Sequence, residues 1–192
     1  MYDRSLRIET ARLVLRQPRL EELDDWADFM RDEQNMRFIG GVQVRMNVWR
    51  QLMISVGSWT AMGLGVFSVI ERSSGTWLGR VGPVNPDGWP GTEVGWSLRH
   101  EYWHRGFATE AACAAMDWAF DKLGWHEVIH CVAPENLASQ LVARRLGSVN
   151  RGPGKLPPPL DASVVDIWGQ TRAEWQVNRS ALRGAEQQGQ RR

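Results

Sequence analysis

The chain has 192 residues, a length that fits a single domain. Hydrophobic residues make up 43% and charged residues 23%, as in ordinary globular proteins, and no apolar run approaches the roughly 18 residues of a membrane-spanning helix. The 23 basic residues nearly balance the 22 acidic ones. The resulting net charge of +1 gives no general attraction for nucleic acid or anionic lipid, so we expect neither a nucleic-acid partner nor a membrane, and any anion site must be local.

The number of cysteines and the composition of the first residues indicate in which cellular compartment the protein works. The two cysteines, Cys113 and Cys131, are too few for a disulfide scaffold and lack the CxxC spacing of a metal site. The segment 1–13 carries charges throughout and has no apolar stretch of signal-peptide length. We therefore expect a cytoplasmic protein. The eleven tryptophans suit cores, clefts and interfaces alike, and they make a homodimer a further expectation.

Short apolar runs bounded by turn residues predict strands, and apolar residues spaced by three and four predict helices. In chain order, the expected elements are a strand at 13–16, helices at 20–30 and 49–59, a strand hairpin at 66–70 and 76–81, a loop at 85–91, a strand at 93–98, a helix at 108–123, a strand at 127–133, a helix at 136–146 and a strand at 164–168. This order favours an α+β, or mixed α/β, fold with one central twisted mixed sheet flanked by helices. We expect one domain over 1–183 and a polar, frayed tail over 184–192.

The segment between the strand at 93–98 and the helix at 108–123 has the pattern of an anion site. Gly106 lets the backbone approach a ligand closely, because glycine has no Cβ. The N–H groups of a helix's first turn and the positive end of its dipole favour phosphate. An ordinary strand-to-helix turn has the same composition, so this segment alone leaves both interpretations open.

Three motifs in chain order favour the anion site. They are Glu93–Leu98, Tyr102–Ala111 and Pro134–Ser139, the last followed by Leu146 and Gly147. Together they resemble the GNAT superfamily of N-acetyltransferases, and within it the RimJ/RimL branch, whose better-known members acetylate the N-termini of ribosomal proteins. The family signature Q/R-x-x-G-x-G/A falls on Trp103, Gly106 and Ala108, with tryptophan in place of the usual first residue. The resemblance covers residues 9–175.

This resemblance implies a single GNAT-like domain that binds acetyl-CoA where the strand at 93–98 splays from its neighbour at 127–133. The pantetheine arm would pair with the strand's backbone, and the pyrophosphate would lie on N–H groups of the segment 104–109, in agreement with the anion site inferred above. The implied cosubstrate-binding residues are Trp96, Ser97, Leu98, His104, Arg105, Gly106, Phe107, Ala108, Thr109, Asn136 and Ser139. No metal is implied.

Acetyl transfer from a thioester to an amine requires a neutral amine, a stabilised oxyanion and a proton for the departing thiolate. Glu93 is the candidate for removing the amine proton, directly or through water, because amines of the lysine type are protonated near pH 7. The alternative for Glu93 is a structural salt bridge at a strand end. For the oxyanion, the resemblance implies the backbone N–H of Leu98.

The proton donor is where this sequence departs from much of the superfamily. The frequent donor is a tyrosine seven residues after the motif asparagine, and here that position is Ala143. The RimJ/RimL-like branch suggests Ser139 instead. Ser139 equally fits a first-turn residue that satisfies backbone groups, and Asn136 can cap its helix, bind the cosubstrate or do both.

Three other patterns are interpreted as structural. Segment 126–130 matches HExxH, but its valine and isoleucine predict a strand, in which the two histidines stand about 13 Å apart, too far to share a zinc ion. Cys113 and Cys131 are interpreted as small buried residues. Arg144 and Arg145 are interpreted as a solvated helix face.

The sequence thus predicts an acetyl-CoA-dependent N-acetyltransferase that works by direct attack in a ternary complex, because no activated nucleophile is evident. The first acceptor to expect is the N-terminus of a protein or peptide. The alternatives are a small amine, such as an antibiotic, amino acid or polyamine, and a catalytically silent CoA-binding module. The loop 85–91 and the proline-rich, extended segment 153–159 are expected to border the acceptor cleft, because long irregular connections often carry specificity.

Overall fold

The structure, a computed structural model, describes residues 5–189, and for residues 183–189 it describes the backbone alone. The chain folds into two compact units. Unit 1 comprises Met1–Val84 and Gly95–Ala115, and unit 2 comprises Asn85–Val94 and Met116–Arg192. Strand β5 (Glu93–Leu98) and helix α4 (Phe107–Lys122) each contribute residues to both units.

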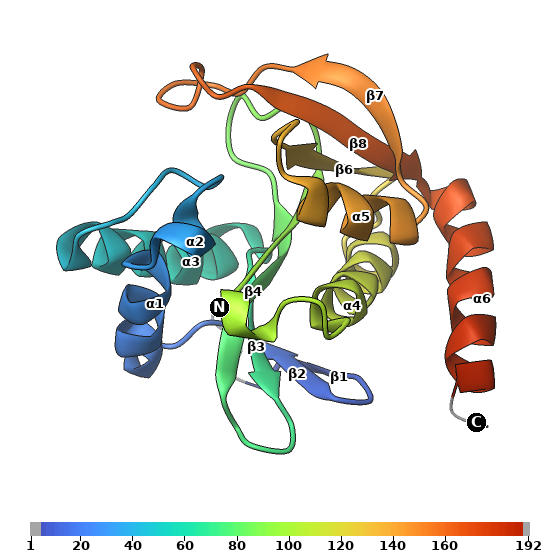
Figure 1. The fold of residues 1–192 in the computed structure, drawn as a ribbon, viewed down its shortest axis with the longest axis horizontal. Coiled ribbons are helices and arrows are strands. Elements are labelled where there is room, and N and C mark those ends of the chain that lie inside the picture. The colour runs from blue at the N-terminus through green and yellow to red at the C-terminus, as the bar shows by residue number, and fades with distance from the viewer. Residues whose placement is uncertain (1–4, 190–192) are drawn as a thin grey trace. The chain divides into compact units, whose positions relative to one another are not determined.

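Unit 1 combines antiparallel strands with the first helices of the chain (Figure 1). Its strands are β1 (Arg7–Glu9), β2 (Leu13–Arg16), β3 (Phe67–Glu71), β4 (Trp77–Val84) and the last residues of β5, adjacent in that order. Its helical elements are the 3₁₀ helices η1 (Leu20–Glu22) and η2 (His100–Tyr102), the helices α1 (Leu23–Met30), α2 (Glu33–Met36) and α3 (Arg45–Met62), and the first half of α4.

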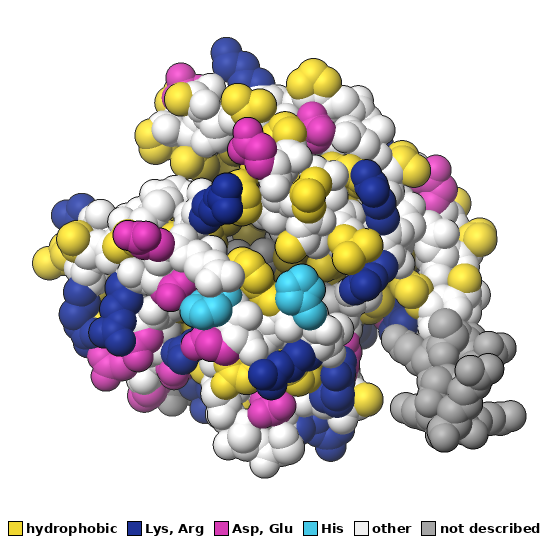
Figure 2. Space-filling model, in the orientation of Figure 1, with side chains coloured by type: hydrophobic (Ala, Val, Ile, Leu, Met, Phe, Trp, Pro, Cys, Tyr) yellow, Lys and Arg dark blue, Asp and Glu magenta, His cyan; other side chains and the backbone are white. Residues whose placement is uncertain are grey.

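Helix α1 forms because apolar residues recur at spacings of three and four along 23–30 and all fall on one face. This face packs against α3 and β4, where Trp26, Phe29 and Trp77 meet in one apolar cluster with Met30, Val48 and Leu52. Trp26 and Trp77 have ring centroids 6.2 Å apart. The outer surface of α1 to α3 carries acidic and basic side chains next to one another (Figure 2), among them the ion pair of Arg45 with Asp24.

Unit 2 is built on the start of β5 and three strands beside it, in the order β5-β6-β8-β7 (Figure 1). Its further elements are β6 (Glu127–Val132), α5 (Leu137–Arg145), β7 (Val149–Gly154), β8 (Val165–Thr171), α6 (Arg172–Gly189) and the second half of α4. The β5–β6 pair is parallel and has a register of one residue pair, Glu93 with Ile129, whereas β6–β8 and β7–β8 are antiparallel. Phe120 of α4 stacks on Trp175 of α6 at 6.4 Å.

These strands and helices confirm the expected α+β class with one mixed sheet, and they confirm most of the expected elements. Five of the eleven tryptophans are buried and belong to the core. The elements that the sequence did not predict are β1, α2, η2, β7 and α6. Strands β1 and β7 lie at the ends of the strand order, where short, charged or proline-containing segments are tolerated and leave no alternating pattern.

The expected tail 184–192 falls partly within α6, and its last residues, 190–192, lie outside the described residues. The domain boundary at 183 stays a prediction. Among the described helices, none is long and apolar enough to cross a membrane.

Candidate active site

Two left-handed residues shape the turn that leads into α4. His104 has φ 61° and Gly106 has φ 80°. The helix begins at Phe107, and the N–H of Glu110 donates to the C=O of Gly106 over 3.1 Å. The N–H groups of residues 107–109 therefore have no acceptor within the helix. Unmet N–H groups next to left-handed residues, at the positive end of a helix dipole, form a binding place for an anion.

Side chains around the turn fit the same kind of ligand. The hydroxyl of Thr109 is enclosed and has no hydrogen-bond partner in the part of the chain that the structure describes. The guanidinium of Arg12 lies 3.3 Å from the place that a Cβ on Gly106 would occupy, and Arg105 is exposed. The turn thus places N–H groups without a helical acceptor next to Arg12, which pairs with Glu110, while the Arg105 guanidinium lies over the Tyr102 ring at 5.3 Å.

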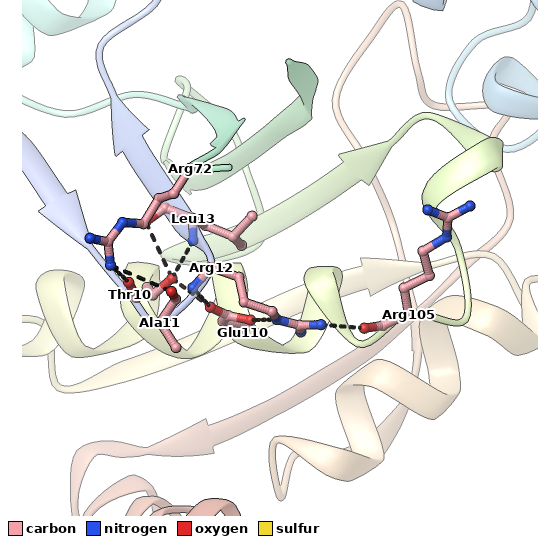
Figure 3. A network of polar contacts seen from close by, with 7 residues as sticks. All are labelled: Thr10, Ala11, Arg12, Leu13, Arg72, Arg105 and Glu110. Atoms are coloured by element: carbon pink, nitrogen blue, oxygen red, sulfur yellow. Dashed lines mark hydrogen bonds and ion pairs between the residues drawn. The ribbon is translucent and has the colours of Figure 1, made fainter. Parts of the chain in front are cut away.

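Glu110 ties this turn to the loop between β1 and β2 (Figure 3). Its carboxylate accepts hydrogen bonds from the Thr10 hydroxyl (2.6 Å), the Arg12 N–H (2.9 Å) and the Arg12 Nε–H (2.7 Å). The same Arg12 guanidinium donates to the C=O of Arg105 over 2.9 Å. Because charge-assisted hydrogen bonds are among the stronger ones, this network fixes the backbone of the turn from both sides.

The end of β5 lies beside the turn within unit 1. The N–H of Arg99 donates to the C=O of Leu78 in β4, so the N–H and C=O of Leu98 point to the other side of the strand. The C=O of Leu98 accepts from the Trp103 indole N–H over 2.8 Å, which joins β5 to the turn. Gly79 of β4 passes so close that a Cβ would lie 2.3 Å from the Ser97 C=O. Trp96, Ser97 and Leu98 therefore form a firmly held strand end.

Glu93 stands in unit 2, and its carboxylate is held by two neutral donors. The Trp89 indole N–H donates to Oε2 over 2.6 Å, and the Cys131 N–H donates to Oε1 over 3.0 Å. Glu93 is 7% exposed and has no ion pair among the described residues. Burial raises the pKa of the Glu93 carboxyl, against the lowering effect of hydrogen bonds from the Cys131 N–H, the Trp89 indole and the Cys131 thiol. The salt-bridge alternative considered for Glu93 is therefore not what holds it.

His130 connects β6 to β5 next to Glu93. Its Nδ1 lies 2.7 Å from the Val94 C=O, which can only accept, so Nδ1 carries the proton. Its Nε2 must then accept, and the Ser148 hydroxyl donates to it over 3.0 Å. Burial lowers the pKa of His130 to about 4, so the ring is neutral near pH 7. His130 therefore acts as a polar link between strands.

The series of hydrogen bonds that starts at the Val94 C=O continues from Ser148 to Gln170 and Asn178. The Gln170 Nε2–H donates to the Ser148 hydroxyl over 2.8 Å, and the Asn178 Nδ2–H donates to the Gln170 Oε1 over 2.9 Å. Each group donates toward β5, because the Val94 carbonyl at the far end cannot donate. Consecutive buried hydrogen bonds of this kind strengthen one another by polarisation, and they hold the backbone next to Glu93 in one position.

The residues expected at the start of α5 contact one another. Asn136 caps this helix, since its Oδ1 accepts from the Ser139 N–H over 3.1 Å. The Ser139 hydroxyl has no hydrogen-bond partner among the described residues, so it is not used to satisfy backbone groups. Ala143 is buried in the same helix.

The structure also places the residues that the sequence analysis interpreted as structural. Residues 127–132 form β6, which is the strand expected for the HExxH match. Burial and the neighbouring Glu93 raise the pKa of the Cys131 thiol, which keeps it protonated and weakly nucleophilic. Arg144 lies over the Trp168 ring at 5.3 Å. The described residues contain no group of three or more His, Cys, Asp or Glu side chains placed to hold a metal ion.

Three contributors were missed from the sequence. Arg12 anchors the turn, Trp89 donates to Glu93, and His130 holds Val94. A signal existed for His130 alone, because a lone polar residue in the apolar run Val128–Val132 must find a buried partner. Arg12 acts across a long sequence separation, and Trp89 reaches Glu93 from four residues away through an irregular loop, so no periodic pattern reveals either contact.

Comparison with known proteins assigns the family. A family model described as an acetyltransferase (GNAT) domain matches residues 12–149. The chain therefore belongs to the GNAT acetyltransferase family. The uncharacterized N-acetyltransferase YnaD of Bacillus subtilis strain 168 is 30% identical over 86 residues, which are 45% of this chain and 51% of that protein. The chain spans about half the length of the curated relatives that it matches.

Solved structures show the same fold. An acetyltransferase from Agrobacterium tumefaciens strain C58 is 27% identical with a TM-score of 0.76, over 90% of this chain and 98% of that chain. The ribosomal-protein-S5-alanine acetyltransferase of Vibrio fischeri is 18% identical with a TM-score of 0.70, over 89% of this chain and 99% of that chain. The first likeness confirms the GNAT-like fold, and the second, at its low identity, shows the fold alone.

The turn before α4 yields a direct prediction. Gly106→Val should abolish the protection that CoA gives against thermal unfolding, because valine disfavours φ 80° and its side chain would enter the space between the turn and Arg12. Thermal denaturation with and without CoA measures the effect.

Gly63→Val is the matched control. Gly63 has φ 68° at the end of α3 with no atom within 4 Å of its Cβ position, so the strain is similar while CoA protection should persist. Equal CoA protection in a folded Gly106→Val protein would contradict the placement.

Proposed function

We propose that this chain transfers an acetyl group from acetyl-CoA to a primary amine, and that the turn at 104–109 binds the diphosphate. The observation that carries the proposal is the pair of left-handed residues before α4, held open by the network of Glu110 in a chain of the GNAT family. The cosubstrate supplies the activated acetyl group as a thioester. The backbone at Trp96, Ser97 and Leu98 would pair with the pantetheine arm, and Asn136 is a further contact.

Two residues of the chain would then each carry out one proton transfer. The amine nitrogen would bond to the acetyl carbon to give a tetrahedral oxyanion, and the carbon–sulfur bond would then break. The amine proton would pass to Glu93, directly or through water, and the Ser139 hydroxyl would give a proton to the thiolate and regain one from water. The Leu98 N–H stabilises the oxyanion. A raised pKa suits a base that works near neutral pH, which supports the role of Glu93. The protonated Cys131 thiol next to it supports direct transfer without a covalent enzyme intermediate.

The acceptor that we propose is the N-terminus of a protein or peptide, as in the RimJ/RimL branch. Support comes from the fold shared with a ribosomal-protein acetyltransferase and from two loops of unit 2. The Cβ position of Gly88 lies 3.4 Å from Pro157, so the loop 85–91 and the proline-rich segment 153–159 run side by side. Contrary to the expectation from its prolines, the segment is not extended throughout, because the Leu160 N–H donates to the Pro157 C=O over 2.9 Å and closes a turn there. A preformed turn beside an aromatic residue, Trp89, offers a peptide apolar contact. We place the reaction in the cytoplasm.

The role of Glu93 predicts a change in the pH profile. Glu93→Gln should lower turnover more at neutral than at high pH, where the amine loses its proton without help.

Trp89→Phe removes a donor that lowers the pKa of the Glu93 carboxyl, so this pKa should rise further and the acid limb of the pH profile should move to higher pH. Thiol release across a pH series measures both effects.

Glu127→Gln is the control for these variants, since it changes an exposed carboxylate, paired with Arg151, in the strand beside Glu93. Its pH profile should match that of the wild type. An equal loss of turnover for Glu93→Gln at every pH would assign Glu93 a structural role.

The proline-rich segment yields a prediction on the acceptor. Deletion of two residues within 157–159 should raise the KM for a peptide acceptor and leave the KM for acetyl-CoA nearly unchanged, because the segment packs on the loop of Trp89 and shapes the acceptor side. Initial rates with each substrate varied in turn measure the two constants. A parallel change in both constants, or in neither, would remove the support for a peptide acceptor.

A further inference from the structure

The parallel pairing of β5 with β6 ends, within unit 2, at a backbone hydrogen bond that side chains replace. Glu93 is in register with Ile129, and the Ile129 N–H donates to the Thr92 C=O over 2.9 Å. In a parallel pair, each residue bonds to the two residues that flank its register partner, and the next bond begins two residues further along the strand. In a continued pairing, the next hydrogen bond would therefore join the Cys131 N–H to the Val94 C=O.

Two side chains take up the groups of that hydrogen bond instead. The Cys131 N–H donates to Oε1 of Glu93 over 3.0 Å, and Nδ1 of His130 donates to the Val94 C=O over 2.7 Å. Each side chain thus reaches from its own strand to the backbone of the other, and all four residues belong to unit 2. The N–H that holds the candidate base is available because another donor has taken its ordinary acceptor.

We propose that His130 is a positioning residue of the acetyl transfer, which keeps the Cys131 N–H for the Glu93 carboxylate by donating to the Val94 C=O. Since His130 belongs to β6, its ring spans the distance between this strand and the carbonyl of β5. Without the ring, the buried N–H and C=O groups would pair with each other, and Glu93 would lose the donor on Oε1. This inference rests on the proposed role of Glu93 and names the residue that holds its carboxylate in place.

The hydrogen bonds behind the ring suit this role. The Gln170 amide donates to the Ser148 hydroxyl, which leaves the hydroxyl proton for Nε2 of His130 at 3.0 Å. A donor at Nε2 stabilises the tautomer that carries its proton on Nδ1, as the Val94 C=O requires. His130 and Ser148 are both buried, and the ring is neutral near pH 7 because burial lowers its pKa to about 4. A neutral imidazole held at both nitrogens has one orientation.

The surroundings of the Glu93 carboxylate make its pH dependence a usable readout. The Cys131 N–H and thiol face it from β6, and the Trp89 indole faces it from the loop before β5. The thiol stays protonated, because burial and Glu93 itself raise its pKa. Among the described residues, no charged side chain contributes to the pKa of Glu93. The Cys131 N–H lowers this pKa, so its loss should raise it.

The first test is the pH profile of thiol release for His130→Leu, which removes the donor and keeps a side chain of similar size. Its kcat at neutral pH should fall roughly tenfold or more, because a displaced base is misaligned with the amine. The acid limb of the profile should move to higher pH. His130→Asn is the rescue variant, because its Nδ2–H is as many bonds from the backbone as the imidazole Nδ1 and can still donate to the Val94 C=O. Its profile should lie near that of the wild type.

Asp117→Ala is the matched control. Asp117 accepts hydrogen bonds from the Trp175 indole and from Nε of Arg179, each over 2.9 Å, so the variant also removes polar contacts of unit 2. It should lower the Tm and leave the pH profile unchanged.

Ser148→Ala keeps the His130 donor but loosens the ring, so its acid limb should lie between those of the wild type and His130→Leu. Ser148→Ala carries the test if His130→Leu does not fold, and a profile equal to that of the wild type would then contradict the inference.

A second readout needs no acetylation. The Cys131 backbone amide donates to the Glu93 carboxylate, so its proton shift in NMR spectra should follow the titration of Glu93 in the wild type, in His130→Asn and in Asp117→Ala. In His130→Leu the amide should no longer follow this titration, because its acceptor becomes the Val94 C=O.

The two readouts separate this inference from the proposed function. If no amine releases thiol but the Cys131 amide responds as expected, the proposed acetyl transfer fails and the placement of Glu93 by His130 stands. A Cys131 amide that follows the titration equally in the wild type and in His130→Leu would overturn the inference. A loss of turnover that is equal at every pH, or a His130→Asn profile no closer to the wild type than that of His130→Leu, would overturn it as well.

Discussion

The carboxylate of Glu110 is the constraint on which the cosubstrate site depends. A turn that keeps its N–H groups unpaired and places His104 and Gly106 in left-handed conformations is unstable by itself. Glu110 sits one helical turn further on and takes three donors from Thr10 and Arg12, while Arg12 reaches the Arg105 carbonyl. The loop before β2 thereby stabilises a turn almost 100 residues away, and a ligand finds the turn already formed.

A second set of buried polar groups holds the candidate base in unit 2. The parallel register of β5 and β6 is one residue pair, so backbone groups beyond it need other partners. The Cys131 N–H donates to the Glu93 carboxylate, and the Val94 C=O accepts from His130. Side chains thus replace backbone hydrogen bonds at the point where the register ends. The same contacts fix Glu93 and desolvate it, which links the shape of the strand pair to the raised pKa of the base.

The sequence predicted the parts of the molecule that rest on local patterns. The strands at 67–71, 77–84 and 93–98 and the long helix of Ala111 and Ala115 follow from periodicity and glycine positions, and the anion turn follows from Gly106 before a helix. What it did not predict depends on edge position, on irregular loops or on partners distant in sequence. Strand β7 holds Pro153 at an edge, the bond of Trp89 to Glu93 forms within an irregular loop, and the bond of Arg12 to Glu110 joins segments 98 residues apart.

The central claim is that the unpaired N–H groups before α4 bind the diphosphate of acetyl-CoA. A crystal structure of the protein with acetyl-CoA tests this claim most directly. The account predicts diphosphate oxygens within hydrogen-bonding distance of N–H groups in the segment 104–109, with the bonds from Glu110 to Thr10 and Arg12 unchanged. A diphosphate bound elsewhere, with the turn contacting solvent alone, would contradict it.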